Sequence, residues 1–164
     1  MGFTSGGGFS NIYPRPAYQS SAVKSYLANN SPPRGFNYSG RGYPDVSVAG
    51  SLFKVVIGGN DLYVSGTSLS APTVAGFFSN INAARHRHGK GSVGWVNPVL
   101  YANYSSFVFD ITHGANANGA CTNGFSAVAG WDPASGLGSM NYGLLQSTLV
   151  AMGECWKCGG NIVV

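Results

Sequence analysis

Residues 65–72, with the sequence SGTSLSAP, introduce a run of apolar residues that recur at steps of three and four. This spacing places the apolar side chains on one face of an α-helix. Hydroxyl residues and Pro72 are typical of a helix start, and the basic residues of 85–90 are typical of a helix end. Small residues such as Ala75 and Gly76 leave little bulk along the helix. The pattern therefore predicts a buried central helix that lies close against a sheet.

The composition is that of one loop-rich globular domain. Of the 164 residues, 44% are hydrophobic, only 9% are charged, and 25 are glycine. A formal net charge of +4 on so few charged residues argues against a nucleic-acid partner. No apolar run approaches the roughly 18 residues of a membrane span. We therefore expect no nucleic-acid partner and no membrane partner.

Ser68 is the candidate nucleophile. It stands in a Gly-Thr-Ser turn at the start of the predicted helix, where the first N–H groups have no partner within the helix. These groups and the positive end of the helix dipole would stabilise an oxyanion that develops beside the hydroxyl. The alternative is that Ser68 or Ser70 only caps the helix, which is the ordinary role of a serine here.

A long stretch, 112–139, consists almost entirely of Gly, Ala, Asn, Ser and Thr around the sequence GWDP at 130–133. So long a loop is uncommon in a compact domain unless something organises it. Calcium is suited to this role, because it takes six or more oxygen ligands, including backbone carbonyls, from a flexible chain. From the residues alone, Asp110 and Asp132 are also consistent with turn or capping residues.

Segments along most of the chain, in order, resemble the sedolisins, the serine-carboxyl peptidases, and among them the fungal secreted, tripeptidyl-peptidase-like members. The nucleophile motif of that family is similar to GTSLSAP at 66–72. Segments before it that match are GGFS at 7–10, PAYQ at 16–19 and GRGYPDVS at 40–47. Segments after it that match are NPVLY at 97–101, DIT at 110–112, GWDP at 130–133 and GLG at 136–138.

The resemblance implies an α/β fold: a partial subtilisin-like fold with a mostly parallel sheet, flanking helices and a long calcium-binding loop. Residues 1–152 would form the C-terminal portion of a sedolisin-like peptidase domain, and 153–164 would be an atypical tail. The implied activity is hydrolysis of peptide or protein substrates at acidic pH, as an endopeptidase or a tripeptidyl-peptidase. The implied catalytic group is a Ser-Glu-Asp triad with Ser68 as the nucleophile and a further Asp at the oxyanion hole. The parent family is extracellular, although this chain shows no signal-peptide pattern.

The resemblance also implies one structural calcium ion in the long loop. Carried over by position, its ligands would be the side chains of Asp110 and Asp132 and the backbone carbonyls of Ile111, Val128 and Gly130.

The acidic residues depart from the family pattern. The one glutamate, Glu154, lies in the tail, and no aspartate stands in the context of the triad or of the oxyanion Asp. At about 1.5 Å per residue, His86 and His88 lie too far along the predicted helix to reach Ser68, and His113 reads as a loop residue. A serine hydroxyl without a base is a poor nucleophile. We therefore expect the chain alone to be inactive, and the missing N-terminal half of the peptidase domain is its candidate partner.

Two other interpretations stay open. The chain could be a truncated, non-catalytic remnant that binds calcium or a protein partner. It could also be a subtilase remnant, against which the context of Asp110 and of 131–132 argues. Asp45 is expected to pair with Arg41 or to accept backbone N–H bonds, a structural role.

The three cysteines carry only weak signals. In secreted relatives a cysteine near Cys121 resembles one that bonds to the upstream half. Cys155 and Cys158 have redox or half-zinc spacing, but the sequence holds no second pair.

Overall fold

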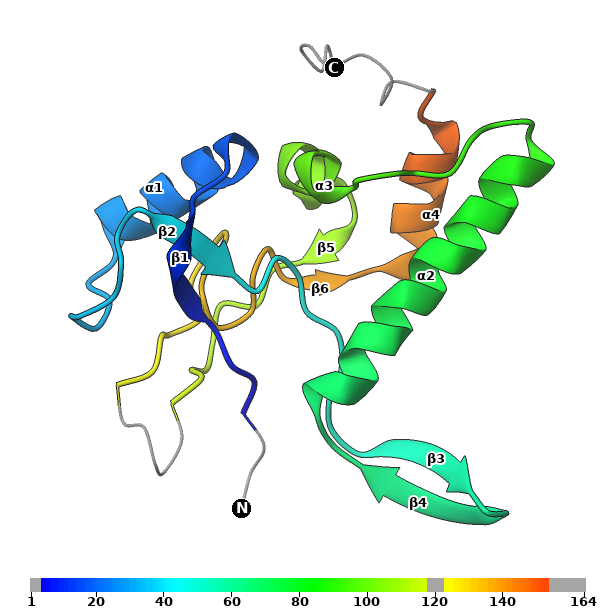
Figure 1. Cartoon of the computed structure of the whole chain (residues 1–164), viewed down its shortest axis with the longest axis horizontal. Coiled ribbons are helices and arrows are strands. Elements are labelled where there is room, and N and C mark those ends of the chain that lie inside the picture. Colours follow the sequence, from blue (N-terminus) through cyan, green and yellow to red (C-terminus); the bar gives the residue numbers. More distant parts are fainter. Residues whose placement is uncertain (1–3, 118–122, 154–164) are drawn as a thin grey trace.

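The structure, a computed structural model, describes residues 4–117 and 123–153 (Figure 1). Its helices and strands, in chain order, are β1 (Gly8–Pro14), η1 (Ala17–Gln19), α1 (Ser20–Asn29), β2 (Gly40–Tyr43), β3 (Phe53–Ile57), β4 (Asn60–Val64), α2 (Thr67–Arg87), α3 (Asn97–Asn103), η2 (Tyr104–Ser106), β5 (Val108–Phe109), β6 (Ser139–Met140) and α4 (Tyr142–Ala151). Among the helices in these ranges, none has the length and apolar character that a membrane crossing requires.

The strands form three antiparallel pairs, β1 with β2, β3 with β4, and β5 with β6. The β3–β4 hairpin turns at Gly58 and Gly59, whose φ angles of 58° and 81° suit a tight two-residue turn. A mostly parallel sheet does not form among the described residues, where one isolated bridge, between Ser47 and Ser139, is parallel. The neighbouring strands that such a sheet needs are not present in these ranges.

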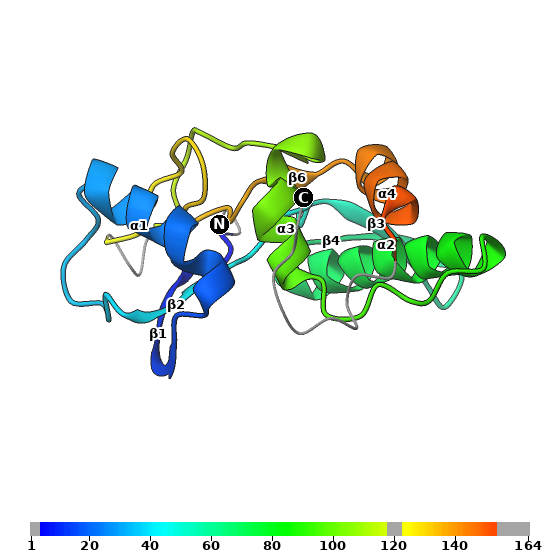
Figure 2. The ribbon, with the colours of Figure 1, turned by 90° about the horizontal axis from the view of Figure 1, so that it is seen from above.

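In the helical core α4 packs against α2, which lies beside it in Figure 2, and α4 also contacts η2. Asn141 caps α4 by accepting the N–H of Leu144 at 3.1 Å, a role to which asparagine is well suited. Four apolar side chains at this junction are fully buried: Ile81, Phe107, Leu145 and Leu149.

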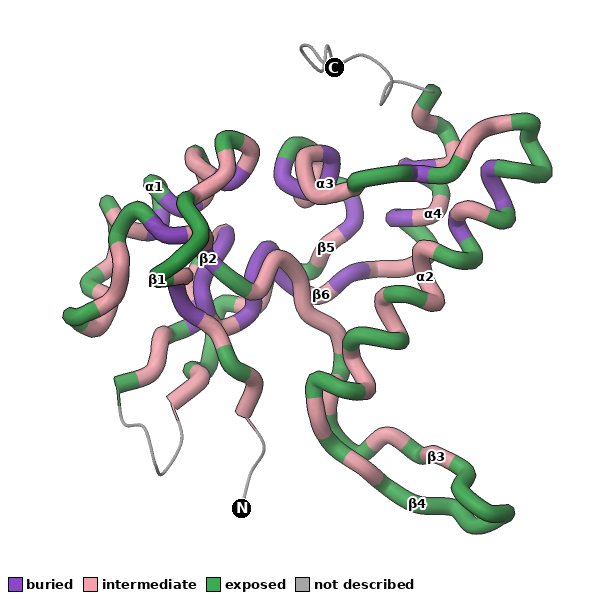
Figure 3. Tube along the Cα trace, in the orientation of Figure 1, coloured by how far each residue is buried: buried purple, intermediate pink, exposed green. Residues whose placement is uncertain are grey.

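The prediction that α2 is buried along its length is wrong. Its buried residues are Ile81, Ala84 and Arg85, all in the C-terminal part, which lies beside α4. The N-terminal part and the β3–β4 hairpin carry mostly exposed and half-buried residues (Figure 3). The apolar spacing identified a helix correctly: Ile81 and Ala84 on that face are buried, and the three residues nearer the N-terminus are partly buried and pack against the core, namely Val74, Phe77 and Phe78.

Candidate active site

The turn between β4 and α2 presents Ser68 to solvent. Gly66 precedes the helix with a φ of 153°, a conformation that favours glycine, and it is the helix N-cap without any side-chain capping bond. Ser68 lies in the first turn of α2 and is exposed. Within the described ranges its hydroxyl makes no hydrogen bond, so a pure capping role for Ser68 is not what the geometry shows.

Three hydrogen bonds hold this turn against residues 49–52. The N–H of Gly66 donates to the carbonyl of Gly50 at 2.7 Å, and the hydroxyl of Ser70 donates to the carbonyl of Ala49 at 3.1 Å. The hydroxyl of Ser65 accepts the N–H of Leu52 at 3.0 Å. The neighbouring serines therefore fix the backbone, while the Ser68 hydroxyl stays available.

The start of α2 also offers backbone donors. Leu69 donates its N–H to the carbonyl of Gly66 at 3.0 Å. The N–H groups of Thr67 and Ser68 make no hydrogen bond to any described residue. Together with the helix dipole, such donors favour negative charge beside the Ser68 hydroxyl.

A cleft of about 760 Å³ lies next to this turn. Thr67, Ser70 and Ala71 of α2 contribute to its lining, whereas Ser68 itself does not. Residues 44–48 and parts of the long loop form the other walls. The cleft therefore borders the Ser68 turn on one side of α2.

Asp45 lines the cleft but is occupied by structural bonds. Arg41 pairs with its Oδ2 atom, as expected, and Asn97 donates to the same oxygen at 3.1 Å. The hydroxyl of Tyr101 donates to Oδ1 at 2.9 Å. Burial, followed by the charge of Asp45, raises the pKa of Tyr101 well above its usual range. Asp45 therefore stabilises the wall of the cleft and is not a free base.

Gln19 completes this network and was missed by the sequence analysis. It is fully buried, and its Nε2 atom donates to the Tyr101 hydroxyl and to the carbonyl of Gly42, both at 2.7 Å. Its Oε1 atom accepts the N–H of Gly42 at 2.8 Å. A lone glutamine at the start of a short helix carries no sequence signal for such a role.

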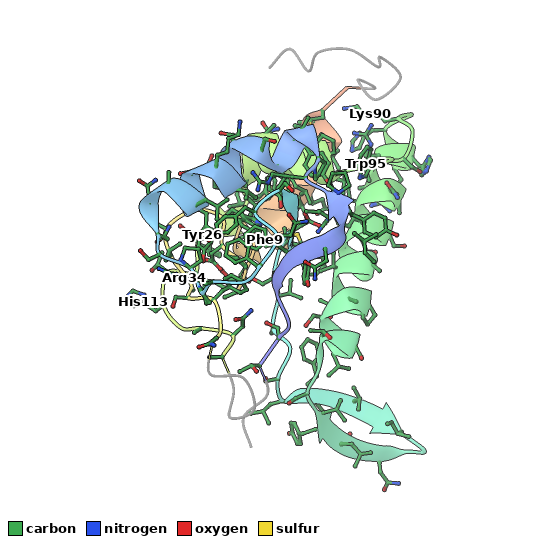
Figure 4. All side chains as sticks on the ribbon, turned by 60° about the vertical axis from the view of Figure 1, so that its left-hand side comes forward. Phe9, Tyr26, Arg34, Lys90, Trp95 and His113 are labelled. Atoms are coloured by element: carbon green, nitrogen blue, oxygen red, sulfur yellow. The ribbon has the colours of Figure 1, made fainter. Side chains whose placement is uncertain are left out.

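Among the described residues, no histidine makes a hydrogen bond to Ser68, although His113 lines the cleft next to the turn. His86 contacts the hydroxyl of Ser92 at 3.1 Å near the end of α2, and His88 is exposed there. His113 contacts the hydroxyl of its neighbour Thr112 at 3.0 Å and lies at the outer edge of the molecule (Figure 4). Among the described residues, no side chain is placed to take the Ser68 proton.

The five predicted metal-site residues lie at the two ends of the long loop, and the structure brings these ends together. Asp110 accepts the N–H of Gly130 at 2.8 Å, and Asp132 accepts the N–H of Val128 at 3.0 Å. Ile111 follows Asp110 directly and lines the cleft. No group of three or more His, Cys, Asp or Glu side chains suited to a metal lies within the described ranges.

Asp132 is a buried carboxylate that organises the loop. Its Oδ1 atom accepts the N–H groups of Ala134 and Ser135 at 2.9 and 2.7 Å, and the hydroxyl of Ser135 lies 3.1 Å from Oδ2. Burial raises the pKa of Asp132, while these donors oppose the shift. The hydrogen-bond partners of this buried carboxylate among the described residues are N–H groups and one hydroxyl, and none of them is a cationic side chain.

Trp131 packs beneath this loop, as the sequence predicts. Its Nε1 atom donates to the carbonyl of Pro44 at 3.0 Å, and its ring meets those of Phe9 and Tyr26 edge-on. The residues Cys121, Glu154, Cys155 and Cys158, together with the predicted tail from 154 on, lie outside the described residues.

The sequence is similar to those of several named peptidases, although no protein-family model matches it. It is 46% identical over 154 residues to aorsin of Aspergillus oryzae, covering 85% of this chain and 23% of aorsin. It is 40% identical over 166 residues to tripeptidyl-peptidase sed1 of Aspergillus fumigatus, covering 92% of this chain and 26% of that protein. It is 40% identical over 158 residues to human tripeptidyl-peptidase 1, covering 90% of this chain and 28% of that protein. The chain thus spans about a quarter of the length of these relatives.

A solved structure agrees with the sequence comparison. The fold matches Pseudomonas sedolisin, a serine-carboxyl proteinase complexed with two molecules of pseudo-iodotyrostatin, with a TM-score of 0.70 and 25% identity. The match covers 90% of this chain and 37% of the sedolisin chain. Over the portion of these proteins that it covers, the chain therefore belongs to the sedolisin family of serine-carboxyl peptidases.

Proposed function

We propose that this chain supplies the nucleophile of a serine-carboxyl peptidase and that Ser68 is the attacking residue. The observation that carries the proposal is the Ser68 hydroxyl, exposed and unbonded among the described residues, beside unpaired N–H groups at the start of α2. The names of the relatives, peptidases at about 40% identity, support the same reaction class. The substrates would be peptides or proteins, cleaved by an endopeptidase or a tripeptidyl-peptidase in an extracellular setting.

In this proposal the Ser68 Oγ atom bonds to the carbonyl carbon of the scissile peptide bond. The unpaired N–H groups of α2 stabilise the oxyanion, and the amine leaves with a proton to give an acyl-enzyme that water then hydrolyses. The proton acceptor is not among the described residues, because Asp45 is held by Arg41 and Tyr101. We assign the acceptor, the triad Glu and Asp, and the oxyanion Asp to the part of a sedolisin domain that lies upstream of residues 1–152.

The test replaces the matched segment of aorsin with this chain and measures peptide cleavage between about pH 3 and 7. We expect the chimera to cleave, and Ser68→Ala to lower kcat about a thousandfold or more, because no other group attacks the carbonyl. The matched control is Ser79→Ala, an exposed serine on the same helix, which should retain activity. The chain alone should be inactive throughout. Cleavage by the chimera that survives Ser68→Ala would contradict the assignment.

A second candidate function is a non-catalytic remnant that binds calcium or a protein partner. The absence of a proton acceptor near Ser68 among the described residues favours it. A folded chimera without any Ser68-dependent cleavage is the result that this candidate predicts.

We also propose one structural calcium ion held by the side chains of Asp110 and Asp132 and the carbonyls of Ile111, Val128 and Gly130. When bound, the ion would supply positive charge to the buried Asp132 carboxylate and link the two ends of the loop. The hydrogen bond from the N–H of Gly130 to the carboxylate of Asp110, which joins the two ends of the loop, supports this placement.

Thermal melting of the chain with and without calcium tests the site. An ion present at a hundred times its Kd adds about 2.7 kcal/mol of stability, and we expect a chelator to remove that gain. Asp110→Asn should abolish most of the calcium response, because it removes an exposed anionic ligand. Asp61→Asn, an equally exposed aspartate in the β3–β4 hairpin, should keep it. Melting curves that are identical with calcium and with chelator would overturn the assignment.

A further inference from the structure

The C-terminal end of α2 and the turn after it carry a concentrated basic sequence. Residues 85–90 read RHRHGK, with five basic residues in six positions. His86, Arg87 and His88 are exposed. The side chains of Arg87 and His88 make no hydrogen bond to any described residue, and His86 contacts the hydroxyl of Ser92 at 3.1 Å. This part of the surface therefore presents cationic and titratable groups to solvent.

The ordinary role of basic residues at a helix end is to complement the helix dipole and its last carbonyls. Arg85 and Lys90 already fill such a role for α4, because both donate to the carbonyl of Met152, at 3.0 and 3.3 Å. Arg85 is fully buried by this arrangement. We name the remaining exposed groups, together with Lys90, the basic end: His86, Arg87, His88 and Lys90.

No described carboxylate neutralises the basic end. The described aspartates lie elsewhere, namely Asp45 in the cleft wall, Asp61 in the β3–β4 hairpin, and Asp110 and Asp132 in the long loop. The elements packed against this part of α2 are α4 and residues 91–96, and neither contains a charged side chain. Their one titratable group, the phenol of Tyr142, packs against the ring of Phe77. Beyond residue 153 the sequence adds one glutamate and one lysine, which cancel in the net charge.

The charge of the basic end depends on pH. Exposed histidines gain a proton as the pH falls from about 8 to 5. The charge therefore rises from the two of Arg87 and Lys90 towards four, once His86 and His88 are protonated. The increase falls in the acidic conditions of the proposed peptidase.

An anionic polysaccharide is the partner whose chemistry fits these groups. Arginine binds sulfate and carboxylate groups through parallel N–H groups, and short basic segments favour heparin-like polymers. Trp95, which is 67% exposed, lies with Lys90 at the end of α2 away from the β3–β4 hairpin (Figure 4). Its ring offers a flat apolar face to the C–H groups of a sugar. Anionic lipids are concentrated in the cytoplasmic leaflet, so an extracellular setting favours the polysaccharide over a membrane.

We propose that the basic end of α2 binds an anionic polysaccharide and that binding strengthens as the pH falls towards 5. The inference rests on the proposed function only for its extracellular and acidic setting. Ser68 and Arg87 are 19 positions apart in α2, which is roughly 28 Å at 1.5 Å per residue. A polysaccharide held at the basic end therefore leaves the Ser68 turn open.

The test measures binding of the 164-residue chain to dextran sulfate by titration calorimetry at low salt. Sulfate groups stay charged from pH 8 to 5, so any pH dependence comes from the protein. We expect binding at least about threefold tighter at pH 5 than at pH 8, and loss of most of it in about 0.5 M NaCl. Dextran without sulfate should not bind. Equal affinity at the two pH values, or equal binding of both polymers, would overturn the proposal.

Variants locate the binding surface. Replacing both histidines, His86→Gln with His88→Gln, should keep the affinity at pH 8 and remove most of the gain at pH 5. Arg87→Gln should weaken binding at least about threefold at both pH values. The matched control is Arg34→Gln, an exposed arginine far from Lys90 in Figure 4 whose side chain makes no hydrogen bond to a described residue.

The control should change the affinity by less than about 1.5-fold, and all these variants should keep the urea midpoint of the parent chain because the positions are exposed. Equal losses in Arg87→Gln and Arg34→Gln would show that the net charge binds the polymer rather than the basic end, which contradicts the proposal.

Other polyanions test the choice of partner. Poly-L-glutamate that binds as tightly as dextran sulfate at pH 7 would identify an acidic protein as the partner and overturn the proposal. Phosphatidylserine vesicles that bind more tightly than dextran sulfate would do the same in favour of a lipid surface. Binding by the Ser68→Ala chain should equal that of the parent. Polysaccharide binding without Ser68-dependent cleavage by the chimera therefore contradicts the catalytic role alone, and cleavage without binding contradicts this inference alone.

Discussion

Two regions of the molecule differ in how far the described residues bury one another. The loop half comprises β1, α1, β2 and residues 110–138, and the arm comprises β3, β4 and α2. In the loop half, Trp131 is 2% exposed and Asp132 is 0% exposed. In the arm, Val56 is 68% exposed and Tyr63 is 69% exposed, although both are apolar or aromatic residues in a strand.

The polar groups follow the same division. The loop half buries Asp132 with several backbone donors and buries Gln19 within a side-chain network. In the hairpin of the arm, the charged pair between Lys54 and Asp61 is exposed on both sides, where such a pair contributes little. A two-stranded hairpin by itself is marginally stable in water. The loop half is thus stabilised from within, whereas the hairpin of the arm is largely exposed to solvent.

The nucleophile candidate belongs to the arm. Ser68 is tied to residues 49–52 by its neighbours, but its own surroundings are open. The comparison therefore indicates that local hydrogen bonds fix the backbone geometry of the turn, while the Ser68 side chain itself remains exposed.

Two glycines with nearly equal φ angles compare the two regions directly. Gly136 in the loop half has a φ of 67°, and an added Cβ would lie 2.5 Å from the backbone of Asp45. Gly89, at the end of α2, has a φ of 69° and nothing within 4 Å of that position. Both changes to Ala incur about 1 to 2 kcal/mol of backbone strain. Gly136→Ala adds a steric clash, so we expect it to lower the free energy of unfolding by about 3 kcal/mol or more.

Urea unfolding of the two variants measures this difference. If Gly136→Ala and Gly89→Ala lowered the free energy of unfolding equally, the loop half would accommodate the new methyl group without a steric cost. The contrast between the two positions would then be wrong.

The pH dependence of stability tests the buried network of Asp45, Tyr101 and Gln19. Its pKa is raised by burial, so the folded chain keeps the phenol proton at a pH where the unfolded chain has lost it. Stability should therefore fall as the pH rises above about 10, the ordinary tyrosine value. Tyr101→Phe should lose about 1 to 2 kcal/mol at neutral pH, because Asp45 and Gln19 each lose a partner.

Tyr101→Phe should also flatten the alkaline slope. Part of the slope should remain, since burial and the charge of Asp132 raise the pKa of Tyr26 to about 12. Unfolding free energies measured from neutral to alkaline pH check both points, with Tyr63→Phe in the exposed hairpin as the control. If Tyr101→Phe left the alkaline slope of the unfolding free energy unchanged, Tyr101 would not be the group that makes stability depend on pH.

The sequence predicted those parts of the fold that depend on local patterns. The helix α2 follows from the spacing of its apolar residues and from the residue types at its two ends. The pair between Arg41 and Asp45 is also local, because four residues separate its members. The position of Ser68 in an exposed turn before a helix is of the same kind.

Long-range packing could not be predicted in this way. From the sequence, Arg85 is one of several basic residues at a helix end. In the structure it is fully buried and donates to the carbonyls of Leu149 and Met152 at the end of α4. Lys90, at the opposite end of α2 from the hairpin (Figure 4), donates to the carbonyl of Val150 at 2.5 Å. Such roles require knowing that the ends of two helices meet. The calcium ligands stay a prediction from resemblance.

The smallest effect is expected in the arm. Tyr63→Ser should change the free energy of unfolding of the chain alone by no more than about 0.5 kcal/mol, because the side chain is already mostly in solvent. Leu145→Ala, in the fully buried core, provides the contrast at about 2 to 5 kcal/mol. Urea unfolding of both variants gives the comparison. A loss above about 1 kcal/mol for Tyr63→Ser would mean that the hairpin packs in the chain alone. The arm would then be stabilised from within, as the loop half is, and the Ser68 turn would not depend on a covering partner for its surroundings.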